Sequence, residues 1–233
     1  MAPGERPAPS AEGIGLVVGL GNAGDEYEGT RHNAGFWFVD RLARRAGATF
    51  RHERKFSAWV ARARLGDAEA WLAKPTTFMN LSGQAVGALA SFYRIGSARI
   101  LVAHDELDIE PGDARLKLGG GTAGHNGLKS IRDHLSSADF WRLRLGIGHP
   151  RTRGLVQDVA DYVLHAPRRE EEEAIRGAID RAEAVLPLLL EGRFERARVQ
   201  LGAQPAAASA AASASASASP SAPAPKKAGG ERP

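Results

Sequence analysis

Hydrophobic and polar positions follow two different periods along this chain, which predicts strands interleaved with helices. A short apolar run covers residues 14–20 and stops at glycine, which is typical of a buried strand. A polar segment follows, and apolar residues then recur at helical spacing from about Gly35 to Ala46. This order places the polar segment at the carboxyl end of a strand, where open α/β sheets bind ligands.

The same two periods predict the other elements. These are strands at 56–65, 68–74, 100–103, 115–118 and 139–147, and helices after Ser82, through 128–135 and after Pro167. Because strands and helices alternate around one hairpin at Gly66–Asp67, we expect a single α/β domain. Its sheet should be twisted, mixed and mostly parallel, with flanking helices.

Four residues carry more specific structural predictions. Ser82 is the expected N-cap of its helix. Pro187 should kink or end the last helix, because proline lacks the backbone N–H that a helix interior needs. In strand 139–147, Arg142 and Arg144 alternate with apolar residues, so we expect one basic face.

The two ends of the chain differ in composition from its middle. Residues 203–233 contain no Val, Ile, Leu, Met, Phe, Trp or Tyr, and residues 1–12 are polar and rich in proline. Neither segment can bury enough apolar surface to offset its ordering entropy, so we expect both to be disordered. Residues 13–202 should therefore form the one catalytic domain.

Composition narrows the functional classes. The chain has no cysteine, which excludes disulfides and a thiol nucleophile. Its formal net charge of +4 permits a polyanionic partner without demanding one. We find neither an apolar leader nor an apolar run of membrane-spanning length, so we expect a cytoplasmic protein that does not enter a membrane.

Unusual polar residues follow several predicted strands. They are Asn22, His32, Asn80, Asp105, His125 and Asn126. The chain has no G-x-S-x-G nucleophile motif, but a His and an Asp from different loops can pair to activate water. Asparagine amides can hold a carbonyl group and stabilise its developing oxyanion. Together these residues predict hydrolysis of an activated acyl group.

Each of these residues also has a purely structural interpretation. His32 can bond the backbone at a helix start, and Asp105 can form an Asx turn. Asn22, which lies between glycine-rich positions, can be a turn residue with positive φ. Asn80 and Asn126 can cap the helices that they precede.

Three other motifs are less convincing. Gly19–Gly24 matches the dinucleotide fingerprint, but acidic residues follow it and Gly29 interrupts any helix there, which disfavours a pyrophosphate. Residues 127–130 insert one residue into the phosphate-loop pattern. The His and Asp residues lack the recurrent short spacings of metal ligands. We therefore expect no metal and no cofactor.

Several blocks of the chain resemble the signature segments of bacterial peptidyl-tRNA hydrolases. They are GLGNAGDEYEGTRHNAGF, KPTTFMNLSG, VAHDELD, KLGGGTAGHNGLKSI and RLRLGIGHP, in the family's order between about Ile14 and Leu201. The resemblance implies a phosphorylase/hydrolase-like α/β fold that cleaves the ester between a peptide and tRNA. Such an enzyme recycles tRNAs from prematurely released peptidyl-tRNA. Ala23 departs from the family, which commonly has proline there.

The resemblance also implies roles for individual residues. His32 corresponds to the general base, Asp105 to the residue that stabilises its basic form, and Asn22 to the residue that discriminates blocked from unblocked aminoacyl groups. Our expected substrate contacts are Tyr27, Phe78, Met79, Asn80, His125 and Asn126.

Basic residues supply the expected contacts to tRNA. Lys117, Lys129 and Arg142 are candidates for binding phosphates by charge and position, which suits an enzyme that accepts any tRNA sequence. We expect a monomer. The alternative is a non-catalytic RNA-binding module on the same fold, and an esterase assay separates the two.

Overall fold

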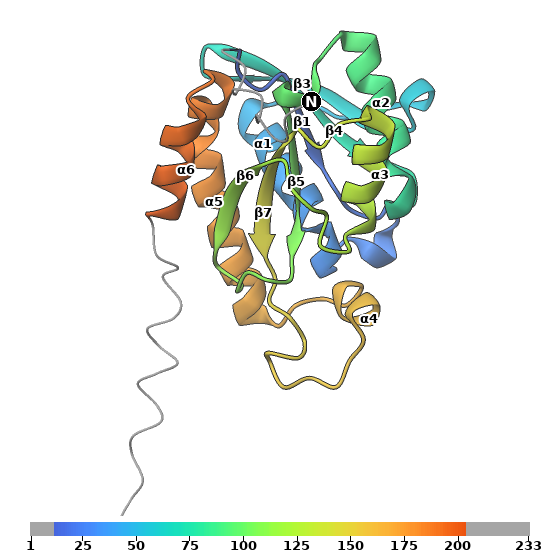
Figure 1. The fold of residues 1–233 in the computed structure, drawn as a ribbon, viewed down its shortest axis with the longest axis vertical. Helices are drawn as coiled ribbons and strands as arrows, with labels where there is room; N and C mark the ends of the chain where they lie inside the picture. Colours follow the sequence, from blue (N-terminus) through green and yellow to red (C-terminus); the bar gives the residue numbers. More distant parts are fainter. Residues whose placement is uncertain (1–11, 204–233) are drawn as a thin grey trace, which may run out of the picture.

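A seven-stranded sheet with helices on both faces dominates residues 12–203, the range that the computed structural model describes (Figure 1). Its strands are β1 Leu16–Gly19, β2 Arg51–Glu53, β3 Ala58–Leu65, β4 Ala68–Pro75, β5 Ile100–Glu106, β6 Ala114–Leu118 and β7 Trp141–Gly146. The helices are α1 Ala34–Ala46, α2 Ser82–Tyr93, α3 Asn126–Leu135, α4 Val159–Val163, α5 Arg169–Leu190 and α6 Phe194–Gly202. Residues 1–11 and 204–233 lie outside the described range, so their expected disorder stays a prediction.

The strand order is β2-β3-β4-β1-β5-β7-β6. Strands β4, β1, β5 and β7 are parallel, whereas β3 and β6 run antiparallel to their neighbours. The central strand β1 is buried on both faces, which explains its uninterrupted apolar run. The predicted fold class, a mixed sheet with a mostly parallel core, is confirmed.

Two hydrophobic cores lie on opposite faces of this sheet. On one face, Val17 of β1 belongs to a core with residues of α1, α5 and α6. On the other face, Leu16 and Val18 belong to a core with residues of α2 and α3. Successive β1 side chains thus point to opposite faces, as the pleat of a strand requires.

Gly35 fixes how closely α1 approaches the sheet. A Cβ atom at this position would lie 2.3 Å from the carbonyl oxygen of Ala103 and 2.5 Å from the backbone nitrogen of Leu20. Only glycine tolerates that approach, because any side chain would overlap the backbone. The start of α1, and the short 3₁₀ turn Arg31–Asn33 before it, are therefore held against the carboxyl ends of β1 and β5.

Several predicted boundaries were wrong. Ser82 is the first residue of α2 rather than its N-cap, and its Oγ donates to the carbonyl oxygen of Met79 at 2.9 Å. Helix α5 continues past the exposed Pro187 to Leu190, so the proline does not end the helix, whereas the alternative of a kink stays a prediction.

Other elements differ in extent or were not predicted. Strand β5 runs beyond the expected 100–103 to Glu106, so Asp105 lies within the strand. The short elements β2, α4 and α6 were not predicted. No helix within residues 12–203 has the length and apolar character to cross a membrane.

Candidate active site

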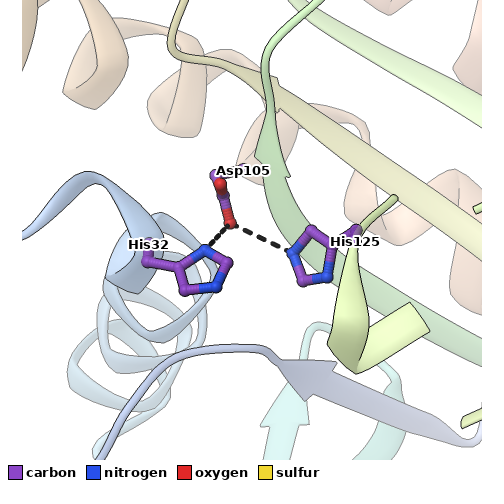
Figure 2. A group of neighbouring side chains, drawn as sticks. All are labelled: His32, Asp105 and His125. Atoms are coloured by element: carbon purple, nitrogen blue, oxygen red, sulfur yellow. Dashed lines mark hydrogen bonds and ion pairs between the residues drawn. The ribbon is translucent and has the colours of Figure 1, made fainter. Parts of the chain in front are cut away.

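One carboxylate bridges two imidazole rings at the carboxyl edge of the sheet (Figure 2). Asp105 near the end of β5 places Oδ1 2.8 Å from Nδ1 of His32 and 3.1 Å from Nε2 of His125. His32 comes from the 3₁₀ turn that precedes α1, and His125 is the N-cap of α3. The fold therefore brings together three residues from separate segments of the sequence.

Hydrogen bonding assigns the proton positions on these rings. Nδ1 of His125 accepts the backbone N–H groups of Gly127 and Leu128, at 3.2 and 3.4 Å, so it carries a lone pair. The proton of a neutral His125 is then on Nε2, which donates to Asp105. His32 likewise donates from Nδ1 to Asp105, and this leaves the lone pair on its Nε2 available to accept a proton.

The carboxylate also controls the charge of the site. Burial lowers the pKa of His32, but the negative charge of Asp105 and its hydrogen bond outweigh burial, so the net pKa is raised. Burial raises the pKa of Asp105, yet His32 and His125 more than offset this and hold the pKa well below its usual range. Asp105 is therefore an ionised acceptor rather than an acid.

His104 is a third imidazole beside the pair, and it remains uncharged. Burial and the neighbouring His125 lower the pKa of His104 to about 3. Its Nδ1 donates to the carbonyl oxygen of Asp105 at 2.6 Å, and its ring packs edge-on against His125 with centroids 5.1 Å apart. His104 thus contacts both Asp105 and His125, and it leaves the Asp105 carboxylate to His32 and His125.

A cavity of about 590 Å³ opens beside His32 and Asp105. Asn22, Met79, His125 and Asn126 line it, and α4 supplies an apolar wall. A second hollow of about 760 Å³ shares part of this lining. The residues of the second hollow that were expected to touch substrate are Asn22, Tyr27, Phe78, Met79, Asn80 and Asn126. The structure therefore gathers these candidates around two adjoining hollows.

Asn33 is a residue of the site that sequence reasoning missed. It is buried, and its side chain clamps the backbone of Asn22 from both sides. Oδ1 of Asn33 accepts the Asn22 N–H at 2.7 Å, and Nδ2 donates to the Asn22 carbonyl oxygen at 3.0 Å. This clamp fixes the loop from which the Asn22 side chain lines both hollows. The sequence signalled only a second asparagine in the polar segment.

The expected basic face of β7 is corrected by the structure. Arg142 is only 4% exposed, and its guanidinium donates to the backbone carbonyls of Gly119 and Gly121. Arg144 pairs with Glu106 at 2.8 Å. Both terminal nitrogens of the Arg142 guanidinium are bonded within the protein, and Arg144 is held by Glu106, so Arg142 shapes the glycine-rich loop instead of offering an exposed phosphate contact. Lys117 and Lys129 are exposed.

The hydrogen bonding of the site fits a proton relay better than a metal centre. Ligand atoms of His32, Asp105 and His125 lie within 4.8 Å of one another. A metal on Nε2 of His125 would move the ring proton to Nδ1 and break the cap of α3. It would also displace the Nδ1 proton of His32. The expectation of no metal stays a prediction.

The dinucleotide fingerprint lacks the helix that it requires. After Gly24 the chain forms a 3₁₀ turn, Asp25–Tyr27, whereas α1 begins only at Ala34. No helical N–H groups therefore face a pyrophosphate at Gly19–Gly24.

Comparisons with known proteins agree with this geometry. A family model for peptidyl-tRNA hydrolase matches residues 16–208. Peptidyl-tRNA hydrolase from Acinetobacter baumannii is 45% identical over 83% of this chain and 97% of its own, with a TM-score of 0.79. Its Arg119Gln mutant is 44% identical over 86% and 100%, with a TM-score of 0.81. A peptidyl-tRNA hydrolase crystallised with N-propanol is 46% identical over 82% and 95%, with a TM-score of 0.78.

These matches confirm the family indicated by the signature blocks, and they favour an enzyme over a non-catalytic RNA-binding module. The chain belongs to the peptidyl-tRNA hydrolase family, the enzymes that hydrolyse the ester bond of peptidyl-tRNA.

Proposed function

We propose that His32 is the general base with which this protein hydrolyses the ester bond of peptidyl-tRNA. One observation carries the assignment: the bond from Nδ1 of His32 to Asp105 leaves Nε2 unprotonated at the wall of the cavity. A base in this position can take a proton from water as the water attacks. An ester needs no stronger nucleophile than an activated water molecule.

The reaction balances with these groups alone. Water gives one proton to Nε2 of His32, and its oxygen bonds to the ester carbonyl carbon to form a tetrahedral oxyanion. As the intermediate collapses, the bond to the ribose oxygen of the terminal nucleotide breaks, and His32 returns its proton to that oxygen. Asp105 stabilises the transient imidazolium charge while remaining ionised. The products are the free tRNA and the peptide carboxylic acid, which then loses its proton to the solvent.

Asn22 is the residue that we propose to select N-blocked substrates. Its side chain lines both hollows and can donate to and accept from the neutral amide beside the ester. A free aminoacyl ester instead presents an ammonium group, whose burial is costly without a paired carboxylate. The two carboxylates that line the cavity beside His32 are committed, Asp105 to its histidines and Glu106 to Arg144.

Lys117 and Lys129 are the proposed contacts to tRNA phosphates. Lys117 lies on β6 opposite Arg142, three residues and two strands from Asp105, which is roughly 14 Å at normal strand spacings. A lysine at that distance does not touch the ester but can hold the backbone of the acceptor end. Lys129 is exposed on α3.

We further propose that the protein acts as a monomer in the cytoplasm. Every group in the proposed mechanism comes from one chain, so no second copy is needed to complete the site. Peptidyl-tRNA arises where ribosomes translate, which supports a cytoplasmic location.

The test compares N-acetyl-aminoacyl-tRNA with free aminoacyl-tRNA in the wild type, Asn22→Asp and Asn22→Ala. We expect the wild type to cleave only the blocked substrate at a useful rate. Asn22→Asp should narrow the gap, mainly by slowing the blocked substrate, because its charge pairs with an ammonium group. Asn22→Ala should lose rate without tolerating the free amine. An unchanged ratio of kcat/KM in both variants would move discrimination away from Asn22.

A further inference from the structure

The residue directly before His32 is a buried cation that bonds the segment forming the apolar wall of the cavity. Residues 148–168, called the cap below, connect β7 to α5 and carry α4 (Figure 1). Val159, Val163 and Leu164 of the cap line the cavity beside His32. Val159 is 36% exposed and Leu164 41% exposed, so the cap offers apolar surface to the cavity.

The side chain of Arg31 bonds the backbone carbonyls at the end of α4. Arg31 is 5% exposed, and its Nη1 lies 3.2, 3.1 and 3.1 Å from the carbonyl oxygens of Tyr162, His165 and Ala166. The backbone N–H of Arg31 also donates to His165 at 3.2 Å. The guanidinium carbon lies 4.1 Å from the ring centre of Tyr162. One side chain thus satisfies the carbonyls that the end of a helix leaves without intrahelical partners.

A carboxylate orients the same guanidinium from its other side. Nη2 of Arg31 donates to Oε2 of Glu171 on α5 at 2.8 Å, and Oε1 of Glu171 lies 2.6 Å from Arg153 of the cap. Burial raises the pKa of Glu171, but the bonds from Arg31 and the backbone of Arg168, with the charge of Arg153, lower it overall. Glu171 is therefore ionised and joins Arg31, the cap and α5 in one network.

This arrangement depends on the planar fork of arginine. Donors on two different guanidinium nitrogens reach the backbone carbonyls and the carboxylate, while the flat face stacks on Tyr162. A lysine ammonium is a point charge and cannot make all of these contacts at once. Carbonyls left without a donor would seek water, and the cap would open.

We propose that Arg31 is a positioning residue that holds the cap over His32, so that the apolar wall of α4 contacts the acyl side chain of the substrate. This inference rests on the proposed function of His32 and adds a determinant of acyl preference. Because Arg31 and His32 are adjacent on one 3₁₀ turn, the same turn fixes both the base and the wall facing it. An acyl group with a large apolar side chain gains from this wall, whereas glycine has nothing to place against it.

The test compares N-acetyl-leucyl-tRNA with N-acetylglycyl-tRNA in Arg31→Lys and Glu171→Gln. We expect Arg31→Lys to lower kcat/KM by about tenfold or more on the leucyl substrate, mainly through KM, and by no more than about threefold on the glycyl one. Glu171→Gln keeps the carbonyl contacts of Arg31. Its loss of kcat/KM should therefore also be greater on the leucyl than on the glycyl substrate, but smaller than that of Arg31→Lys. Hydrogen exchange of residues 159–166 should accelerate in both variants.

Arg181→Met is the matched control, because Arg181 of α5 also donates to backbone carbonyls but lies outside the cavity lining. It should leave the leucyl-to-glycyl ratio unchanged. Equal losses on both substrates, or unchanged exchange in α4 of a folded Arg31→Lys, would overturn the proposal. If the wild type cleaves neither substrate, the proposed function fails, and hydrogen exchange alone still decides whether Arg31 holds the cap.

Discussion

Replacing Asp105 by asparagine isolates the charge that the site places behind its base. The new amide has nearly the shape of the carboxylate, and its oxygen can still accept from both histidines. What it lacks is the negative charge 2.8 Å from Nδ1 of His32. The substitution therefore tests electrostatic stabilisation with little change in packing.

The size of the effect follows from the charges that face each other in the transition state. As His32 takes the proton from water, its ring becomes an imidazolium whose charge centre is roughly 4 Å from the carboxylate. Two unit charges at about 4 Å interact by about 4 kcal/mol at an effective dielectric constant near 20. Because proton transfer is incomplete in the transition state, we expect Asp105→Asn to lower the rate by about 10²- to 10³-fold.

The assay is single-turnover hydrolysis of N-acetyl-aminoacyl-tRNA across pH. The wild-type rate should fall on the acid side as His32 becomes protonated, at a pH above the ordinary histidine value, because Asp105 raises its pKa overall despite burial. In Asp105→Asn that midpoint should move to lower pH, since the amide no longer favours the charged ring. Asp108→Asn, an exposed carboxylate nearby, is the control and should match the wild type.

One result would refute this reasoning. A folded Asp105→Asn protein whose rate lies within about tenfold of the wild type, with the acid midpoint unmoved, would mean that the charge does not act on the base. A shifted midpoint at nearly normal rate would instead show that the carboxylate tunes His32 but contributes little to the transition state.

Two further predictions concern binding and stability. Catalytic efficiency should fall as the salt concentration rises, because phosphate contacts release counterions. Lys117→Met and Lys129→Met should each reduce the slope of log kcat/KM against log salt concentration by about one, whereas the control Lys55→Met, at an exposed lysine, should not. Equal slopes in all variants would contradict the phosphate contacts. The lowered pKa of His104, about 3, means that the unfolded chain takes up its proton first as pH falls below the ordinary value. His104 should therefore contribute a fall of about 1.4 kcal/mol per pH unit in the free energy of unfolding between about pH 6 and 4, and His104→Asn should reduce the measured slope by about that amount. An unchanged slope would contradict the burial of His104 as a neutral ring.

The parts of the fold that the sequence predicted best are those set by local periodicity. The run before Gly21 and the apolar stripe after Gly35 located β1 and α1 because each buries a continuous surface. The polar segment between them therefore had only one place to lie, at the carboxyl edge of the sheet. This constraint brought His32 and Asp105 into one candidate site before any contact was known.

What the sequence could not predict depends on distant backbone. Alternation in β7 put Arg142 on a polar face but could not show that its guanidinium donates to the carbonyl oxygens of Gly119 and Gly121. Helix α4 is too short for a periodic signal, and its end is capped by Arg31 from far along the chain. His125 was recognised as a polar residue near the site. Its hydrogen bonds, from Nε2 to Asp105 and at Nδ1 from the start of α3, form only in the folded loop.

The most direct test of the central claim is the single-turnover rate of His32→Ala on N-acetyl-aminoacyl-tRNA, measured with enzyme in excess over substrate. Loss of a positioned base should slow hydrolysis by about 10²- to 10⁴-fold while affinity for the substrate stays close to normal. His52→Ala, an exposed histidine on β2, should behave as the wild type. A folded His32→Ala protein that cleaves the substrate at nearly the wild-type rate would contradict the assignment of His32 as the base.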